Sequence, residues 1–181
     1  MMPAGDSDKV LVHRCRRGDT GAFRALVDRY QRPLYNAAYR VLGNADDARD
    51  VTQAAFMEVA ERLDAYDPDH RFFSWIYRIA LNRALNLLRR KDREEPVGDD
   101  QPAGTADPES RAADSEVSNR VQRALMRMSE DHRVVLTLRH IAGCSYREIG
   151  SILELEEKTV KSRLFEARQR MREALRDLQR D

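Results

Sequence analysis

The segment Ser145–Leu175 reads SYREIGSILELEEKTVKSRLFEARQRMREAL, and it decides the fold of the C-terminal part of the chain. Ser145 followed three residues later by Glu148 is a capping box, in which each side chain satisfies an otherwise unpaired backbone amide at a helix start. A short helix is therefore predicted from Tyr146 to about Glu154.

A second helix is predicted after a charged turn that ends near Lys158. Its apolar residues recur at spacings of four, three, four, four and three, which places them on one stripe of an α-helix; they are Val160, Leu164, Ala167, Met171, Leu175 and Leu178. The opposite face carries Lys158, Lys161, Ser162, Arg163, Arg168, Arg170 and Arg172. Such a face suits the major groove of DNA, where phosphates and base edges accept hydrogen bonds. We therefore interpret the segment as a helix-turn-helix; the alternative is a solvated amphipathic helix in a bundle.

Charge is high but nearly balanced in this chain of 181 residues, with 35% charged residues and a formal net charge of +1. Contact with a polyanion therefore depends on locally segregated charge. Such segregation is present: Arg71–Arg93 contains seven basic residues and one acid, whereas Glu94–Glu116 contains eight acids and one base.

The cysteines and histidines give no sign of a metal or disulfide framework. Cys15 and Cys144 lie far apart, which favours a reducing compartment. His140 and Cys144 have a helical spacing, but no second pair of ligands accompanies them, so we expect no metal and no cofactor. No apolar run approaches the roughly 18 residues that span a bilayer. The sequence predicts a soluble, cytoplasmic protein without membrane insertion.

Two helical regions are expected before residue 43. Asp8 is expected to cap the first, with Val10, Leu11 and Cys15 facing inward. The second covers about 20–42 and contains Pro33, which removes a backbone hydrogen bond and predicts a kink or a break near position 32.

A third helix is predicted over about 46–65. Its buried stripe is expected to comprise Val51, Ala55, Val59, Ala60 and Leu63. Asp50, Gln53, Met57 and Glu58 lie away from that stripe and face either solvent or a partner.

Aromatic residues crowd into the next stretch, just before and within a helix predicted from about 74 to 93. Five of the twelve aromatic residues fall between positions 66 and 77: Tyr66, Phe72, Phe73, Trp75 and Tyr77. They alternate with Arg71, Arg78 and Arg83, and rings beside arginines can stack on unpaired bases while the cations follow the backbone. Periodicity does not decide which of these rings are buried.

Residues 94–116 are predicted to form a flexible acidic linker, because this stretch is rich in proline, glycine and acids and cannot form a core. Helices are then expected over 117–128 and 130–141, with Ile141 facing inward, before the helix-turn-helix. The sequence thus predicts an all-α fold with two helical domains, 1–93 and 117–181, the second a four-helix module. No strand is expected.

Several motifs in this order resemble the bacterial sigma factors of the extracytoplasmic-function class, within the sigma-70 family. They are DDARDVTQAAF at 46–56, YDPD at 66–69, FSWIYRIALN at 73–82, the acidic linker, and YREIG followed by TVKSRLFEAR between 146 and 168. The resemblance extends from Asp8 to Leu178. It implies that the protein catalyses nothing itself and binds core RNA polymerase, through the beta and beta-prime subunits, and promoter DNA. It further implies an anti-sigma factor as a regulatory partner.

The resemblance also implies roles for individual residues. Polymerase binding falls on Asp50, Gln53 and Phe56. Binding and melting of the minus-ten element fall on Arg71, Phe72, Trp75, Tyr77, Arg78 and Asn82, with Asn82 in a pocket for a flipped base. Reading of the minus-thirty-five element falls on Lys158, Thr159, Lys161, Ser162, Arg163 and Phe165. The linker corresponds to a segment that threads the nucleic-acid channel of the polymerase.

Two positions depart from the family pattern. Glu154 stands where a glycine usually follows the scaffold helix, which predicts a tighter turn or a longer helix. Glu166 stands where many members carry a base after the phenylalanine of the second helix; a carboxylate accepts from cytosine but repels phosphate.

Two other classes of function were compared with this one. A helix-turn-helix repressor or activator that acts without polymerase explains residues 117–178 equally well. It does not explain the aromatic and basic residues at 71–93 or the acidic linker. An all-helical enzyme has no support, since His13, His70, His132 and His140 are dispersed.

Overall fold

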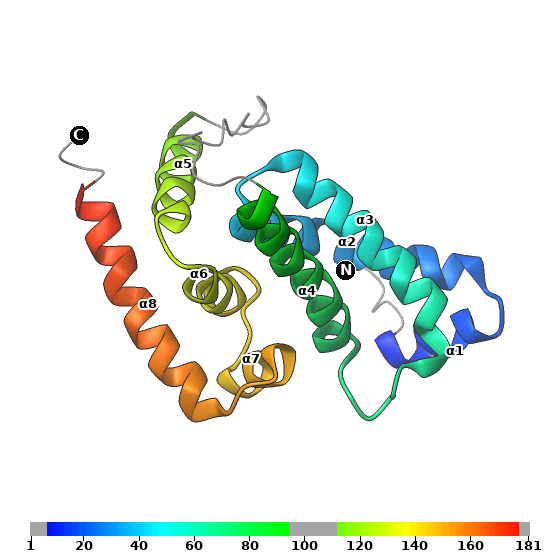
Figure 1. Cartoon of the computed structure of the whole chain (residues 1–181). Coiled ribbons are helices and arrows are strands. Elements are labelled where there is room, and N and C mark those ends of the chain that lie inside the picture. The colour runs from blue at the N-terminus through cyan, green and yellow to red at the C-terminus, as the bar shows by residue number, and fades with distance from the viewer. Residues whose placement is uncertain (1–6, 95–111, 178–181) are drawn as a thin grey trace.

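The computed structural model describes residues 7–94 and 112–177, and every regular element in these ranges is helical. The first half contains α1 (Asp8–Arg16), α2 (Thr20–Leu42), α3 (Ala45–Arg62), the 3-10 turn η1 (Leu63–Ala65) and α4 (Phe72–Glu94). The second half contains α5 (Ala112–Met126), α6 (Glu130–Leu136), the π-helical turn η2 (Thr137–Ile141), α7 (Tyr146–Leu153) and α8 (Glu157–Asp177) (Figure 1). The prediction of an all-α fold with a four-helix second half is confirmed.

The first half is organised around α2, α3 and α4, which pack pairwise against one another, with α1 against α2. Its fully buried side chains include Leu26, Leu34, Val59 and Ile76. Each aliphatic side chain of this kind contributes about 1.5–3 kcal/mol through burial. The three-helix core therefore holds the exposed surfaces of α3 and α4 in fixed positions.

Helix α2 runs unbroken past Pro33 from Thr20 to Leu42, so the alternative of a break near position 32 is wrong. Residues on both sides of the proline stay in the core, with Leu34 and Val41 at 0% exposure. Burial along one helix face offsets the single backbone hydrogen bond that proline removes. Gly43 ends the helix in the left-handed conformation at φ 73°.

Some predicted helix starts and inward-facing residues are corrected by the structure. Ser7, not Asp8, caps α1, and the Asp8 carboxylate instead accepts a hydrogen bond from the Tyr30 hydroxyl at 2.5 Å. Leu11 faces inward as predicted, but Val10 is 45% exposed, because the helix turns Val12 inward in its place.

Ala60 and Ile141 are exposed as well, although both were expected in the core. Ile141 leaves the predicted helical stripe because the backbone widens into the η2 turn after Leu136. Helix α5 begins at Ala112, inside the predicted linker 94–116, and α4 begins at Phe72, two residues before the expected start.

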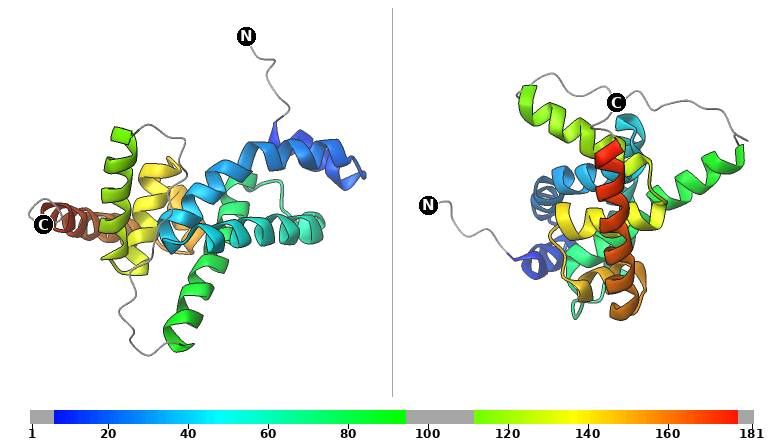
Figure 2. Two further views of the ribbon diagram at one scale, coloured as in Figure 1. Left: turned by 90° about the horizontal axis from the view of Figure 1, so that it is seen from above. Right: turned by 90° about the vertical axis from the view of Figure 1, so that its left-hand side faces the viewer.

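The two halves pack against each other, although they are far apart in sequence. α4 contacts α7, while α2 contacts α5, α6 and η2, and Figure 2 shows α5 to α8 gathered beside α1 to α4. The Arg40 guanidinium donates to the carbonyl oxygen of Ser118 at 3.1 Å, and Gln122 donates to the carbonyl oxygen of Tyr39 at 3.1 Å. The buried apolar residues of both halves form one cluster.

No helix in the described ranges combines the length and the apolar character that crossing a membrane requires.

Candidate nucleic-acid interface

The predicted capping box at the start of α7 is formed. The Ser145 hydroxyl accepts from the backbone N–H of Glu148 at 3.2 Å, and the Glu148 carboxylate accepts from the backbone N–H of Ser145 at 2.8 Å. Burial acts to raise the pKa of Glu148, but hydrogen bonds from Ser145 and the charge of Arg71 outweigh it, so this pKa lies below its usual value. The scaffold helix therefore starts where the sequence predicted.

The turn between α7 and α8 is made by Glu154 and Gly150 together. Glu154 adopts the left-handed conformation at φ 56°, the one non-glycine residue in the described ranges with positive φ. A Cβ on Gly150 would lie 2.7 Å from the carbonyl oxygen of Leu155. The turn is thus neither tighter nor extended into a longer helix, because Glu154 itself takes the conformation that favours glycine.

Helix α8 divides into a buried stripe and an exposed basic face, as predicted. Val160, Leu164 and Ala167 are at most 1% exposed, whereas Leu178 lies outside the described residues. Lys158, Lys161 and Ser162 are exposed, and so is Phe165, whose 61% exposure is high for a large aromatic ring. Thr159 and Arg163 are half-buried at the edge of this face.

Acidic neighbours hold two cations of α8 in place. Lys161 Nζ lies 2.9 Å from a Glu157 carboxylate oxygen, and this hydrogen bond raises the pKa of Lys161. Arg163 Nη1 lies 3.1 Å from Asp131 Oδ2 on α6. Both cations are thereby paired with carboxylates in this structure.

Two predicted minus-ten cations, Arg71 just before α4 and Arg78 within it, contact α7 in this structure. Arg71 pairs with the Glu148 carboxylate, while the Arg78 guanidinium donates to the carbonyl oxygen of Ser151 and lies 3.1 Å from Glu154 Oε1. These contacts, together with the packing of α4 on α7, place the basic side of α4 against the helix-turn-helix.

Asn82 is exposed one turn further along α4. It lines an open polar groove between the two halves, whose other walls include Asn86, Arg89 and Leu153, with Arg163 of α8 on the opposite side. The groove thus brings the side chain predicted to hold a flipped base near a side chain predicted to read the other promoter element.

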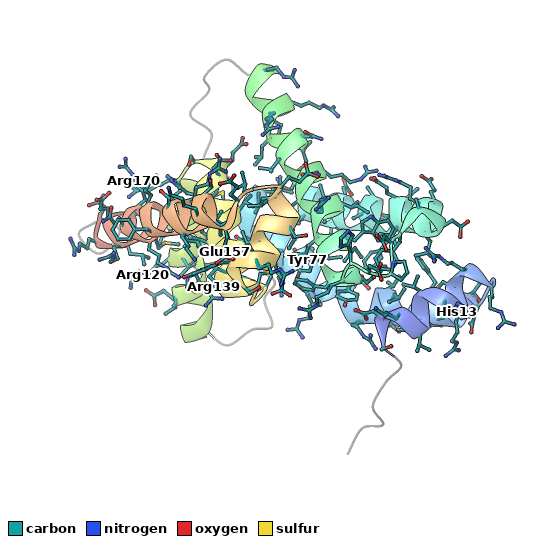
Figure 3. All side chains as sticks on the ribbon, turned by 90° about the horizontal axis from the view of Figure 1, so that it is seen from below. His13, Tyr77, Arg120, Arg139, Glu157 and Arg170 are labelled. Carbon is teal, nitrogen blue, oxygen red and sulfur yellow. The ribbon has the colours of Figure 1, made fainter. Side chains whose placement is uncertain are left out.

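The aromatic cluster is mainly a core, which corrects two predicted DNA contacts. Phe72 and Tyr77 are each 1% exposed and cannot stack on a base in this arrangement. The Phe72 ring fills the space between Tyr30, Tyr66 and Trp75, with centroid distances of 5.5, 5.6 and 5.8 Å. Figure 3 shows Tyr77 where α4 meets the second half, and burial raises its pKa. Trp75 remains half-buried.

A large open groove of about 840 Å³ lies between α2 and α3. Gln53 is exposed on its wall, and the exposed Asp50 lies on the same helix, whereas Phe56 is only 8% exposed and contributes little more than a ring edge. Met57, at 59% exposure, and Tyr35 add apolar surface. Sequence reasoning missed Tyr35, because it considered the polar face of α3 without the neighbouring helix.

A second apolar groove, of about 390 Å³, lies between α5, η2 and α8. Val121, Leu125 and Ile141 line it, and His140, Arg168 and Arg172 form its basic edge. Burial and the charges of Arg168 and Arg139 lower the pKa of His140. No sequence pattern predicted this groove, since Ile141 was expected in the core.

Histidine, cysteine and carboxylate side chains form no cluster suited to a metal ion within the described residues.

Comparison with known proteins accounts for both halves. Residues 26–94 match the family model Sigma-70 region 2, and residues 118–171 match Sigma-70, region 4. The match over 26–94 includes the basic and aromatic stretch at 71–93, which the alternative of a helix-turn-helix repressor does not explain.

Similar proteins cover almost the whole chain. ECF RNA polymerase sigma factor SigW of Bacillus subtilis is 34% identical, over 94% of this chain and 97% of the relative. The ECF RNA polymerase sigma-E factor of Escherichia coli K12 is 37% identical, over 90% and 91%. Among solved structures, CnrH in complex with the cytosolic domain of CnrY superposes with a TM-score of 0.75 at 30% identity, covering 95% of this chain and 99% of that one. The chain therefore belongs to the extracytoplasmic-function class of RNA polymerase sigma factors, in the sigma-70 family.

Proposed function

We propose that three separate surfaces carry out the sigma function of this chain: the α2–α3 groove binds core RNA polymerase, α4 binds and opens the minus-ten element, and α8 reads the minus-thirty-five element. The polymerase catalyses RNA synthesis, and the sigma factor itself catalyses nothing. It acts in the cytoplasm, with two domains that comprise α1 to α4 and α5 to α8, and with the acidic linker between the end of α4 at Glu94 and the start of α5 at Ala112.

The exposed basic face of α8 is the single observation that carries this proposal. Lys158 and Lys161 supply cations for phosphates, while Ser162 and Phe165 supply a hydroxyl and an apolar edge for bases. Lys161→Ala is expected to weaken transcription most at promoters that depend on the minus-thirty-five element. Equal effects at promoters with and without that element would contradict the assignment.

Asn82 is the side chain of α4 proposed to hold a minus-ten base. Its amide is exposed and offers both a donor and an acceptor to a base edge. Trp75, Arg71 and Arg78 complete this surface, and Phe72 and Tyr77 support it from the core. Asn82→Ala is expected to reduce initiation while polymerase affinity stays unchanged; parallel loss of both would contradict the base-pocket role.

The α2–α3 groove supports polymerase binding because it combines exposed Gln53 and Met57 with an open hollow between two helices that a partner protein can contact. Asp50 and the edge of Phe56 belong to the same surface. An anti-sigma factor that covers this surface would block polymerase, and CnrH, a protein of similar structure, has been solved with the cytosolic domain of CnrY.

The decisive experiment is run-off transcription with sigma-free core polymerase, with and without this protein, on fragmented DNA of the source genome. New discrete start sites that share two upstream elements would support the proposal. DNA binding without new start sites, together with failure to co-purify with core polymerase, would favour a repressor.

A further inference from the structure

Glu166 is an acid in the middle of the basic stretch of α8, whereas the other acids of this helix, Glu157, Glu173 and Asp177, lie toward its ends. Between Lys158 and Arg172 the sequence has six basic residues, namely Lys158, Lys161, Arg163, Arg168, Arg170 and Arg172, and one acid, Glu166. The Glu166 side chain is 59% exposed. A carboxylate on a face that approaches phosphates is repelled by them, so this side chain weakens binding unless it accepts hydrogen bonds from the DNA.

Glu166 shares its helix face with the proposed base-reading residues. It lies one turn after Ser162 and directly beside Phe165, so all three project from neighbouring points of the exposed surface. The Ser162 hydroxyl donates to Glu166 Oε1 at 3.4 Å, and Glu166 Oε2 lies 3.6 Å from His132 Nε2. These contacts from two helices orient the carboxylate before DNA is bound.

The chemistry of a carboxylate selects one base. An ionised carboxylate only accepts hydrogen bonds, and in the major groove cytosine presents only the N4 amino donor. Adenine presents its amino group beside the N7 acceptor, while guanine and thymine present acceptors to the same region. We propose that Glu166 is a specificity-determining residue that selects cytosine at one position of the minus-thirty-five element, an inference that rests on the proposed function of α8.

The inference predicts a change of base rather than a loss of binding. In Glu166→Gln the amide can donate to adenine N7 and accept from adenine N6, so the preferred base at that position is expected to change from cytosine to adenine. In Glu166→Ala the preference there is expected to flatten. The preference of the wild type for cytosine over the other bases at that position is expected to be on the order of tenfold, as for other single side-chain contacts to base edges.

The test is transcription by holoenzyme from a promoter library in which the upstream element is randomised, with the selected sequences read for wild type, Glu166→Gln and Glu166→Ala. Glu173→Gln is the matched control, because Glu173 is an exposed acid further along α8, 3.7 Å from Arg170. The control is expected to retain the wild-type base profile. Melting temperatures of all variants check that α8 remains folded.

The outcomes separate this inference from the proposed function. A cytosine that becomes adenine in the glutamine variant at one position, with all other positions unchanged, supports it. Identical base profiles for wild type and both Glu166 variants overturn it while leaving the function of α8 intact. If wild-type holoenzyme selects no upstream element, the proposed function of α8 fails, and this inference fails with it.

Discussion

Gly150 shows how one absent side chain shapes the helix-turn-helix. Alanine normally favours a helix over glycine by about 1 kcal/mol. At this position, however, the new Cβ would lie 2.7 Å from the carbonyl oxygen of Leu155, a backbone atom that cannot move without opening the turn. Gly150→Ala is therefore expected to lower the free energy of unfolding by about 1–3 kcal/mol, measured by urea denaturation. Ser151→Ala, at the next and exposed position, should change it by less than about 0.5 kcal/mol; equal effects would refute the close approach.

Because Glu154 has a left-handed conformation, we expect glycine at this position to be more stable than valine, the reverse of the order at an ordinary helix position. At an ordinary exposed helix position valine is tolerated better than glycine, but at φ 56° the β-branched side chain meets the backbone. Glu154→Val is expected to cost about 2 kcal/mol. Glu154→Gly should cost less than about 1 kcal/mol, since it loses only an exposed ion pair with Arg78. Chemical denaturation of the two variants compares them, and a valine variant as stable as the glycine variant would argue against the conformation.

At the scale of elements, an ion-pair cluster ties α3 to α4. The Glu58 carboxylate lies 2.7 Å from Arg62 and 2.8 Å from Arg83, and its side chain is 20% exposed. Burial raises the pKa of Glu58, but the hydrogen bonds and charges of the two arginines outweigh burial and hold it below its usual 4.5. The tie therefore depends on an ionised carboxylate.

This lowered pKa predicts how stability varies with pH. Because the folded-state value is depressed, the contribution of Glu58 is complete above pH 4.5 and is lost as the pH falls through the folded pKa. Glu58→Gln is expected to be less stable than wild type by about 1 kcal/mol at pH 7, and the difference should vanish in acid. Glu61→Gln, at an exposed position on the same helix, is the control. A difference independent of pH would contradict the ion-pair explanation.

Short sequence patterns predicted the helices well, but they did not predict the contacts between helices. The capping box of Ser145 depends on four adjacent residues, so a pattern suffices to find it. Pro33 was expected to kink or break α2 because its cost is local; the helix does not break, because the burial that keeps it continuous comes from packing on other helices. The exposure of Phe72 and Tyr77 was undecided by periodicity for the same reason. Pairs such as Arg71 with Glu148, which lie 77 positions apart, depend on tertiary packing alone.

In the whole molecule, part of the surface proposed to open promoters holds the two halves together. Arg71 and Arg78 form ion pairs with residues of the helix-turn-helix, Glu148 and Glu154, so their proposed contacts with minus-ten DNA would compete with the second half for the same guanidinium groups. α8 lies at the outer edge of the second half, away from α2 and α3 (Figure 1).

Reversing the charges of Arg71 and Arg78 is therefore expected to separate the halves. In Arg71→Glu/Arg78→Glu, attraction to Glu148 and Glu154 becomes repulsion, and the radius of gyration should increase in small-angle X-ray scattering. Exposed ion pairs contribute up to about 1 kcal/mol each, so the separated form should gain roughly tenfold in population. Arg90→Glu/Arg93→Glu makes the same change in net charge at exposed positions of α4 and should leave the radius unchanged. A double variant as compact as wild type would show that apolar packing alone holds the halves.

The burial of Cys144 allows opening of the structure to be followed by thiol labelling. Cys144 is 1% exposed, and burial, aided by the charge of Glu148, raises the pKa of its thiol to about 12, although the nearby charge of Arg71 acts to lower it. At neutral pH few molecules carry the reactive thiolate, and the buried thiol is alkylated only when the structure around it opens. In a Cys15→Ser background, with reclosing faster than alkylation, the labelling rate relative to that of a free thiol measures the fraction of molecules in which Cys144 is accessible.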